Sequence, residues 1–330
     1  MTVIVPCYNE QATIGSLLTA VHGQTYPLDK LEVVVADGLS EDGTRAAIAG
    51  FREAHRAFQV RVVDNPKRTI PSGLNQAIRQ ARGDILVRLD AHSVPIPEYV
   101  ERCIGALEAG NGTNVGGVWK ICAGGPGWMA QGIAAAAAHP IGAGDALYRL
   151  GGEARAVDTV PFGVFRRRLL EKIGGFDETL LTNEDYEFNV RIRRHGGVVW
   201  LDPRISSTYV ARATLRDLAR QYWRYGYWKY RMLQRYPGSV RWRQVLPPLF
   251  VLALIGMTAA APFWPPAAAG LLAAVGSYLL ALLAAGLHMG WRGRDAVLVP
   301  GGMLALASMH ISWGAGFLAS FVSGWFKRHG

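Results

Sequence analysis

The sequence predicts an α/β protein with a mixed, mostly parallel sheet and flanking helices, followed by amphipathic helices and a membrane-spanning helical region. Two observations carry this prediction. Short apolar runs rich in β-branched residues alternate with segments of helical periodicity, which is typical of parallel strands that are buried on both faces. Beyond residue 244 charged residues almost vanish, although the chain as a whole is 50% hydrophobic, with a mean hydropathy of +0.12.

The expected strands are short apolar runs that end at turn formers. In chain order they cover residues 2–6, 31–36, 60–63, 85–89, 158–165 and 198–201. Helical periodicity predicts helices over residues 9–21, 42–51, 70–81, 98–108 and 167–173. The Gly-rich residues 116–132 are expected to hold a strand and a loop, residues 134–138 a short packed helix, and residues 151–156 a mobile loop over a site.

Composition narrows the class of protein. A net charge of +10 admits a nucleic-acid partner, but no nucleic-acid-binding module is recognisable, so we expect none. Much of the lysine and arginine lies between Arg191 and Arg243, just before the apolar region, which favours the cytoplasmic side and anionic lipid. Three cysteines without a CxxC spacing indicate reduced thiols in a cytosolic domain. Residues 3–5 already have the character of a buried strand, so we expect the N-terminal domain to stay inside.

The C-terminal part is expected to meet the membrane in two stages. Residues 215–236 combine arginines with tyrosines and tryptophans, as at a membrane interface. Three apolar segments follow, over residues 245–264, 267–289 and 296–326, each near the ~20 residues that a span needs. We expect three spans, although a third span places Lys327 and Arg328 outside, against the positive-inside tendency, and a re-entrant third segment avoids this. The expected parts are therefore residues 1–212, 213–244 and 245–330.

Three acidic clusters carry the functional hypothesis. Asp37 and Asp90 each end an apolar run, and Asp185 opens a helix-like stretch. Carboxylates at strand ends lie where open α/β sheets bind ligands. One acid facing a nucleoside, one a metal and diphosphate, and one an acceptor hydroxyl are the parts needed to move a sugar from a nucleotide to an alcohol. Strand-end turns and helix dipoles also favour Asp, so each acid has a purely structural alternative. The hypothesis requires Asp90 and Asp185 to lie around one cavity, close enough for one hexose to bridge them.

Five short motifs share an order and spacing that is specific, although each is weak alone. They are Val5-Pro6-Cys7-Tyr8-Asn9-Glu10, Asp37-Gly38, Asp90-Ala91-His92, Gly174-Gly175-Phe176-Asp177-Glu178 and Asn183-Glu184-Asp185. Together they resemble the family 2 glycosyltransferases of the GT-A fold, over about residues 1–235. Arg88-Leu89-Asp90-Ala91-His92 and the stretch from Gln221 to Lys229 are similar to a subgroup, the succinoglycan-type exopolysaccharide glucosyltransferases.

The resemblance implies a donor side for a UDP-sugar. Pro6, Tyr8 and Glu10 would line the nucleoside pocket, Asp37 would contact the uracil, and Asp90 would be the first acid of a DxD-like motif that holds Mn²⁺ or Mg²⁺ on the diphosphate. The chain departs from the family pattern at the third position of that motif, where it has a histidine. Imidazole ligates Mn²⁺, whereas carboxylate and water suit Mg²⁺ better, so His92 is open as a metal ligand, a support for the ligands or a diphosphate contact.

The same resemblance makes Asp185 the catalytic base of an inverting transfer, with Glu184 in support. A base must lie within hydrogen-bond reach of the acceptor hydroxyl from which it takes the proton. Phe162 and Gly163 lie where the family shapes the acceptor side.

Two further residues lie on the donor side of the likeness. Arg68 follows a strand together with Lys67, and a nucleotide contact and a solvated pair are both open for it. Asn75 lies on a helix where the family often places a nucleotide-side contact.

Gln221, Arg224 and Tyr225 resemble the QxxRW motif of membrane polysaccharide synthases, with Tyr in place of Trp. In those enzymes the motif lies near the acceptor site. An aromatic face stacks on a sugar ring, and arginine binds a leaving phosphate. The substitution leaves a processive role open.

We therefore expect an inverting hexosyltransferase that moves a sugar, glucose by the subgroup resemblance, from a UDP-sugar to an acceptor on polyprenyl diphosphate in bacterial exopolysaccharide synthesis. It is expected in the inner membrane as a multi-pass protein whose catalytic domain faces the cytoplasm, and a complex with other polysaccharide-assembly enzymes is open. Three alternative functions are open: transfer to bare polyprenyl phosphate, a processive polysaccharide synthase, and a catalytically inactive membrane scaffold.

Overall fold

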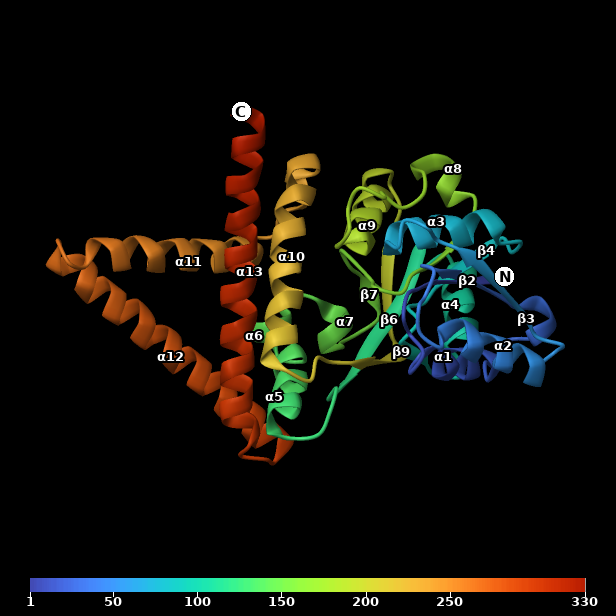
Figure 1. The fold of residues 1–330 in the computed structure, drawn as a ribbon, viewed down its shortest axis with the longest axis horizontal. Coiled ribbons are helices and arrows are strands. Elements are labelled where there is room, and N and C mark those ends of the chain that lie inside the picture. The colour runs from blue at the N-terminus through green and yellow to red at the C-terminus, as the bar shows by residue number, and fades with distance from the viewer. Residues whose placement is uncertain (330) are drawn as a thin grey trace. The chain divides into compact units, whose positions relative to one another are not determined.

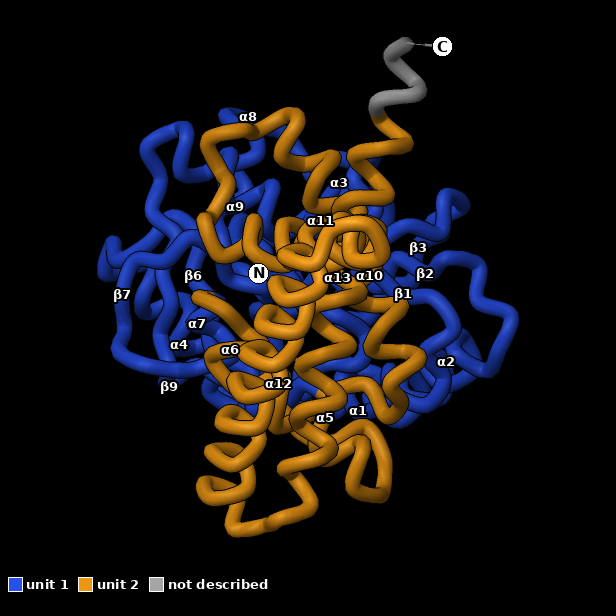
Figure 2. Tube along the Cα trace, turned by 90° about the vertical axis from the view of Figure 1, so that its left-hand side faces the viewer, with its two compact units in different colours: residues 1–120, 146–209 blue, residues 121–145, 210–330 orange. Residues whose placement is uncertain are grey.

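The computed structural model describes residues 1–329, with side chains through residue 324. The chain divides into two compact units, shown in different colours in Figure 2. The first unit holds Met1–Lys120 and Ala146–Tyr209, and the second holds Ile121–Asp145 and Val210–Gly330. Ile121–Asp145, which lies within the expected α/β part of the sequence, thus packs with the C-terminal helices.

The first unit is built on a nine-stranded mixed sheet in the order β3-β2-β1-β4-β8-β6-β9-β5, with β7 paired to β9 (Figure 1). The strands are β1 (Thr2–Cys7), β2 (Glu32–Asp37), β3 (Gln59–Asp64), β4 (Ile85–Arg88), β5 (Val94–Pro95), β6 (Asn114–Cys122), β7 (Arg155–Ala156), β8 (Val164–Arg166) and β9 (Val199–Val210). Strands β3, β2, β1 and β4 run parallel, and β8 pairs antiparallel with both β4 and β6. The predicted mixed α/β sheet with flanking helices is confirmed.

Helices cover both faces of this sheet. Alternate residues of a strand point to opposite faces, and in β1 the residues on both faces are apolar and buried. Val3 and Val5 of β1 join a buried cluster with helices α1, α2 and α4, whereas Ile4 joins a second cluster with α3, α8 and α9. The helices of this unit are α1 (Ile14–His22), η1 (Leu28–Lys30), α2 (Thr44–Ala54), α3 (Ile70–Gln80), α4 (Tyr99–Glu108), α7 (Leu147–Leu150), α8 (Leu169–Ile173) and α9 (Glu184–Arg194). The parallel strands are therefore buried on both sides, as their continuous apolar runs predicted.

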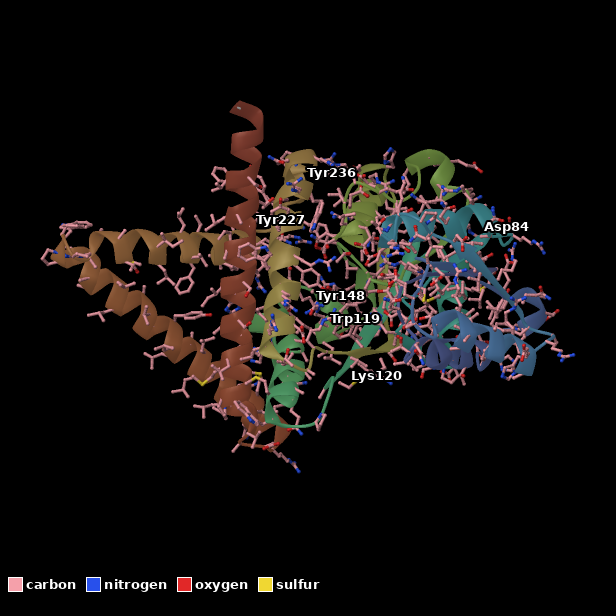
Figure 3. All side chains as sticks on the ribbon, viewed as in Figure 1. Asp84, Trp119, Lys120, Tyr148, Tyr227 and Tyr236 are labelled. Carbon is pink, nitrogen blue, oxygen red and sulfur yellow. The ribbon has the colours of Figure 1, made fainter. Side chains whose placement is uncertain are left out.

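The second unit is helical. Its elements are α5 (Trp128–Ala137), α6 (Pro140–Ala143), α10 (Leu215–Arg235), η2 (Pro237–Ser239), α11 (Trp242–Ala260), α12 (Pro265–Gly293) and α13 (Leu298–His329). Helix α10 carries aromatic side chains, among them Tyr227 (Figure 3). Within the described residues, α11, α12 and the α13 stretch Leu298–Gly324 are long and apolar enough to cross a membrane. The three predicted apolar helices are thus present.

Two strands have different bounds from those predicted. Residues 158–163 form no strand, and β8 begins only at Val164, because Pro161 has no N–H for a ladder. The strand expected over residues 198–201 continues to Val210 as β9. Its Pro203 lies between two short partner strands, β7 opposite Trp200 and Leu201 and β5 opposite Ser207 and Thr208, so its missing N–H costs little there.

Helix boundaries also differ from the prediction. The helix expected from residue 9 begins at Ile14, because Asn9 has a left-handed φ of 53° and its N–H bonds to another loop. The short helix expected over residues 134–138 is the second half of α5, which already begins at Trp128. The expected loop over residues 151–156 ends in the two-residue strand β7.

Candidate functional site at the carboxyl edge of the parallel strands

The parallel strands end at one edge of the sheet, and that edge carries the predicted acids. Strands β1, β2 and β3 are in register, with Cys7 opposite Asp37 and Asp37 opposite Asp64. Strand β4, on the other side of β1, ends at Arg88, and Asp90 follows in the next loop. The carboxyl ends of parallel strands are where open α/β sheets bind ligands. The loops after β1, β2 and β4 therefore border one candidate site.

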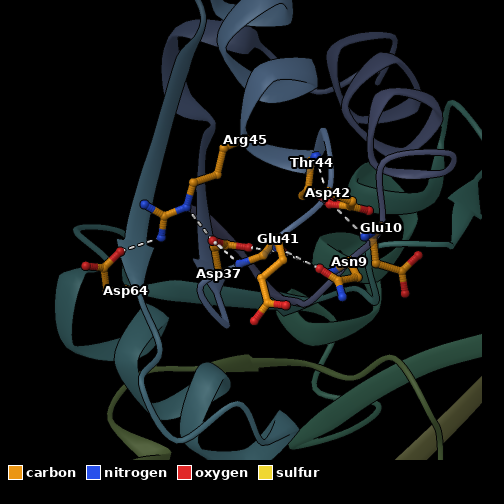
Figure 4. Close-up of polar contacts among 9 residues, drawn as sticks. Asn9, Glu10, Asp37, Glu41, Asp42, Thr44, Arg45 and Asp64 are labelled. Carbon is orange, nitrogen blue, oxygen red and sulfur yellow. Dashed lines mark hydrogen bonds and ion pairs between the residues drawn. The ribbon is translucent and has the colours of Figure 1, made fainter.

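Asp37 is fully buried at the end of β2 and is held from two directions. Arg45 Nε donates to its carboxylate at 2.5 Å, and Ser40 donates from its backbone N at 3.1 Å and from Oγ at 2.5 Å. Arg45 also reaches Asp64 at 2.5 Å (Figure 4). Hydrogen bonds to these two carboxylates raise the pKa of the Arg45 guanidinium. The Asp37 carboxylate is therefore fixed in place beside a cation.

The loops after β1 and β2 are joined to each other by hydrogen bonds (Figure 4). The N–H of Asn9 donates to Ser40 Oγ at 2.8 Å, and Asn9 Oδ1 accepts from the N–H of Glu41 at 2.9 Å. The N–H of Glu10 donates to Thr44 Oγ1 at 2.8 Å. Asparagine tolerates the left-handed conformation that this arrangement gives Asn9. The two loops thus form one connected wall of the site.

Tyr8 and Arg68 face each other beside these loops. Arg68 Nη1 donates to Tyr8 Oη at 3.3 Å, and the guanidinium lies 5.3 Å from the centroid of the tyrosine ring. Arg68 also pairs with Glu41 at 3.0 Å. The ring lies against Gly38, where a Cβ would come within 3.0 Å of Tyr8 Cδ2. Pro6 is buried in β1 below, so Tyr8 and Arg68 provide the partly exposed surface.

Arg88 is the centre of a second polar cluster. Its side chain is 3% exposed, and Nη2 contacts Asp90 Oδ1 at 3.2 Å and Glu184 Oε1 at 2.9 Å. Its Nη1 pairs with Asp185. Burial lowers the pKa of an arginine, but here the charges of Asp90 and Glu184 outweigh burial and the pKa of Arg88 lies above its usual value. Asp90, from the loop after β4, and Asp185, from the first turn of α9, therefore lie at one site.

The sequence-based assignment of site residues did not include Arg88, although a signal was present. Ile85, Leu86 and Val87 form the apolar run that precedes it in β4. A charged residue that ends a buried strand stays buried only if it is paired. The acids that pair with it could not be identified from its local sequence, because Glu184 and Asp185 come from a distant segment.

His92 and Glu10 meet between the loops after β4 and β1, with His92 Nδ1 3.0 Å from Glu10 Oε1. Among the residues that the structure describes, no three His, Cys, Asp or Glu side chains gather closely enough to hold a metal ion. A divalent ion at this edge would take most of its ligands from a diphosphate and water, as Mg²⁺ commonly does. Asp90 and His92 supply oxygen and nitrogen donors that fit such a site.

Asn75 on α3 is engaged within the protein. Its Nδ2 donates to the carbonyl of Phe176 at 2.8 Å and to Glu178 Oε1 at 3.0 Å, and its Oδ1 accepts from the N–H of Phe176 at 2.9 Å. Lys67 pairs with the same Glu178 at 2.7 Å. These bonds fasten the Gly-Gly-Phe-Asp-Glu turn to α3, which is the role that the geometry gives Asn75.

Phe162 and Gly163 lie just before β8, next to Arg88 in β4. The carbonyl of Gly163 accepts from the N–H of Arg88 at 3.0 Å, and a Cβ at this glycine would collide with the side chain of Asn114. Phe162 is 4% exposed and packs against Trp119 with ring centroids 5.8 Å apart. The two residues therefore support the strand that carries Arg88, and the phenylalanine ring belongs to the core.

Gln221, Arg224 and Tyr225 lie on α10 of the second unit. Gln221 Nε2 donates to Tyr225 Oη at 2.8 Å, one helical turn away. Tyr225 packs edge to face on Tyr222, with ring centroids 5.5 Å apart. The motif is thus a local, hydrogen-bonded group on one helix.

A mixed sheet with acids along the carboxyl edge of its parallel half is the arrangement of the GT-A fold, which nucleotide-diphospho-sugar transferases have. A solved member is a mannosyltransferase from Pyrobaculum calidifontis, in complex with GDP-Man and Mn²⁺. It matches 93% of this chain and 86% of its own, with a TM-score of 0.64 and 23% sequence identity. At this level of identity, the match shows that the two proteins share a fold.

The chain belongs to glycosyl transferase family 2, whose model matches residues 2–174. The succinoglycan biosynthesis protein ExoA of Rhizobium meliloti (strain 1021) is 30% identical over 321 residues, which are 96% of this chain and 93% of that protein. A dolichyl N-acetyl-alpha-D-glucosaminyl phosphate 3-beta-D-2,3-diacetamido-2,3-dideoxy-beta-D-glucuronosyltransferase of Methanococcus voltae is 25% identical over 78% of this chain and 81% of its own. The chain is a glycosyltransferase, and the predicted family and subgroup resemblance is confirmed.

Proposed function

We propose that this protein is an inverting, metal-dependent glycosyltransferase that moves glucose from UDP-glucose to an acceptor sugar on polyprenyl diphosphate, in the synthesis of a bacterial exopolysaccharide. One observation carries the proposal: Arg88 pairs with both Asp90 and Asp185. The acid assigned to the diphosphate and the acid assigned to the acceptor therefore flank one site. Similarity to ExoA over nearly the whole chain supports the exopolysaccharide context.

The donor nucleoside would bind against the wall formed by the loops after β1 and β2. Asp37 would accept a hydrogen bond from the uracil, because its carboxylate is held at the strand end by Arg45 and Ser40. Tyr8 would provide an aromatic face, with Pro6 beneath it and Glu10 beside it. Arg68 is 43% exposed and would contact a phosphate, the group that guanidinium binds well.

A divalent ion would bridge the donor diphosphate and Asp90, with His92 as its second protein neighbour. Such an ion supplies charge stabilisation for the departing phosphate. Either Mn²⁺ or Mg²⁺ fits one carboxylate, one imidazole and water, with Mn²⁺ favoured if the imidazole ligates. Asn75 would act indirectly, through the turn that it fastens.

Asp185 would be the base that removes the acceptor proton. It is 25% exposed, so an acceptor hydroxyl can reach it, whereas Glu184 is 9% exposed and directed at Arg88. Arg88 would hold the Asp185 carboxylate in one orientation. The proton would pass from the hydroxyl to Asp185 as the oxygen attacks the anomeric carbon and the nucleoside diphosphate leaves. One base and no covalent intermediate give inversion.

The acceptor would come from the membrane. The proposed parts are a catalytic domain over residues 1–212, interface helices over 213–244 and a membrane region over 245–330. Gln221, Arg224 and Tyr225 would contact the acceptor sugar and its phosphate. Within the catalytic domain, Phe162 and Gly163 would shape the acceptor side. The Methanococcus voltae relative is named for a lipid-linked sugar acceptor, which supports this class. The proposed location is the inner membrane, with the catalytic domain in the cytoplasm and room for other assembly enzymes as partners.

The test is a transfer assay with purified full-length protein in lipid nanodiscs. UDP-glucose, UDP-galactose, UDP-N-acetylglucosamine and GDP-mannose are each offered with Mn²⁺ or Mg²⁺, and the acceptors are bare polyprenyl phosphate and a polyprenyl-diphosphate-linked sugar. We expect one hexose to be added to the lipid-linked sugar from UDP-glucose, as judged by product mass, and none with EDTA.

Each alternative has its own product in this assay. Transfer only to bare polyprenyl phosphate would replace the proposal with a polyprenyl-phosphate glycosyltransferase, and a ladder of products would replace it with a processive synthase. If calorimetry detected no nucleotide binding with either ion, the protein would instead be a catalytically inactive membrane scaffold.

A further inference from the structure

Helix α13 differs from the other two apolar helices in how much protein covers it. In the most apolar window of α11 and of α12, 11% of the residues are buried, whereas in α13 the fraction is 33%. The buried residues of α13 include Ala305, Leu306, Met309 and Ser320, each at most 1% exposed. A helix surrounded by lipid does not have such a stripe, so α13 must pack on other helices of its unit.

Helix α10 packs along the C-terminal half of α13, with both helices running in the same direction (Figure 1). Glycines bring the two backbones together at two places. A Cβ at Gly226 would collide with the backbone of Trp313, and a Cβ at Gly316 would collide with the backbone of Trp223. Further along, the ring of Tyr230 packs on α13. The two helices are thus interlocked over several turns.

Helix α10 is polar on the side away from α13. Its buried residues form one stripe at helical spacing: Leu218, Tyr222, Gly226, Lys229 and Met232. Its exposed charged residues lie outside that stripe: Arg216, Asp217, Arg220, Arg224 and Arg235. A helix of this composition lies at a membrane interface and does not enter the hydrocarbon.

Helix α5 covers the N-terminal half of α13 in the same way. A Cβ at Gly132 would collide with the backbone of Gly301, and Gly301 in turn lies against Trp128. Trp128 is 46% exposed, as is usual for tryptophan at a membrane interface. Helix α13 therefore has α5 and then α10 beside it along most of its length.

We propose that α13 does not cross the membrane but lies in its plane at the interface, together with α10, and that the α11–α12 hairpin is the inserted element. If α13 crossed, α10 would carry its arginines through the hydrocarbon, where ionised side chains are costly. In the plane, α13 turns its exposed apolar residues to the acyl chains while the charged side of α10 stays in water. The inference concerns membrane topology and does not rest on the proposed transfer reaction.

The α11–α12 hairpin has the features of an inserted element. The two helices pack through Phe250 and Tyr278, with ring centroids 4.6 Å apart, and the turn at their tip exposes 87% of Phe263 and 60% of Trp264. From Tyr278 to the tip, α12 extends about 20 Å. Arginines flank the opposite, open end of the hairpin, at positions 241, 243, 292 and 294, where they would meet anionic lipid headgroups.

This topology also removes a conflict in the sequence. Three spans would place Lys327 and Arg328 on the side of the membrane opposite to Arg292 and Arg294. With α13 in the plane, all four basic residues lie on one side, in agreement with the positive-inside tendency.

A depth measurement tests the proposal directly. Single cysteines replace Leu304, Ile311 and Val322, which lie on one face of α13 and are each 45–49% exposed. The background is Cys122→Ser, because Cys7 and Cys103 are buried and burial raises the pKa of the Cys7 thiol to about 12 and that of Cys103 well above its usual value. The full-length protein is labelled with an environment-sensitive dye in phosphatidylethanolamine–phosphatidylglycerol vesicles and quenched by lipids that carry nitroxides at different depths.

We expect the three α13 positions to report one shallow depth, about 5–10 Å below the headgroup boundary. The matched control places cysteines at Leu252 and Phe263 in the hairpin, where depth must increase toward the tip. The helix extends about 27 Å from Leu304 to Val322. A graded series across most of that length would overturn the proposal.

A second measurement does not depend on depth. Topology reporters are fused before residue 1 and after residue 330 of otherwise unchanged protein. An in-plane α13 leaves the two ends on the same side of the membrane, because the hairpin returns to the side on which it entered. Ends on opposite sides would establish three spans and refute the proposal.

Discussion

Two polar clusters lie along the same edge of the sheet, and they are built in opposite ways. Around Asp37 the carboxylate is fully buried, while its partner Arg45 is 45% exposed. Around Arg88 the cation is 3% exposed, while Asp90 and Asp185 are 21% and 25% exposed. In the first cluster a partly exposed arginine therefore holds a buried acid in place. In the second cluster a buried arginine holds partly exposed acids, which can meet a ligand.

The difference indicates which cluster carries the chemistry. A buried charge is costly unless it is paired, so each buried group here fixes its partners. The Arg88 cluster sets Asp90, Glu184 and Asp185 against one guanidinium, which leaves two negative charges uncompensated within the group. Surplus negative charge on the partly exposed carboxylates of Asp90 and Asp185 suits the binding of a cation and the removal of a proton. The Asp37 cluster is suited to recognition.

The largest expected effect comes from removing the proposed base. Asp185→Asn keeps the size of the side chain but cannot take a proton, so kcat should fall by about 10²–10⁴-fold. Nucleotide binding should persist, because the donor wall is unchanged. The measurement is the transfer assay with calorimetry of UDP binding. Glu171→Gln, an exposed acid in the first turn of α8, is the matched control and should retain activity. Full activity of Asp185→Asn would remove the base from the proposal.

Breaking the cluster at its buried cation should destabilise the fold. Arg88→Met leaves three carboxylates without their partner, and losing one side of a buried ion pair costs about 3–5 kcal/mol. Urea unfolding of the full-length protein in nanodiscs measures the loss. Arg102→Met, at a pair with Glu98 in which both side chains are about 40% exposed, is the control and should change little. If Arg88→Met and the native protein unfolded at the same urea concentration, the Arg88 cluster would not stabilise the fold.

The recognition cluster should respond differently. Asp37→Asn removes the charge that Arg45 binds and weakens the proposed contact to the uracil ring. The KM for the UDP-sugar should therefore rise, while kcat changes less. The lost charge-assisted hydrogen bonds should cost about 1–3 kcal/mol in stability. A fall in kcat with unchanged KM would place Asp37 in the chemistry instead.

The smallest effect is expected at the outer end of the same cluster. Asp64 is 60% exposed and pairs with a half-exposed Arg45, and exposed pairs contribute about 0–1 kcal/mol. Asp64→Asn should therefore leave both KM and the unfolding midpoint nearly unchanged. A large effect would mean that Asp64 itself contacts the donor.

The strand ends that carry the site could be predicted, because buried parallel strands have a strong local signal. The apolar runs before Asp37 and Asp90 predicted β2 and β4, and the structure ends β2 at Asp37 and β4 two residues before Asp90. The antiparallel half was harder. Strand β9 continues past Pro203, and only the tertiary pairing explains why it tolerates a proline.

The contacts between distant segments could not be predicted. Nothing near Arg88 in the sequence indicates Glu184 or Asp185 as partners, and nothing near Asn75 indicates that its amide would bond to Phe176. Helix α13 shows the same limit. Its length and apolarity are those of a membrane-spanning helix. That α5 and α10 pack against it is seen only in the folded unit.

The hydrogen bonds between the loops after β1 and β2 have a consequence for protein engineering. Asn9 and Glu10 of one loop each bond to residues of the other, so neither loop has an independent conformation. Grafting the first loop alone from a homologue with another donor preference would leave the amide of Glu41 without its acceptor, Asn9 Oδ1, and would displace the N–H groups that now donate to the hydroxyls of Ser40 and Thr44. Chimaeras intended to change the donor should therefore exchange both segments together, as a single cassette.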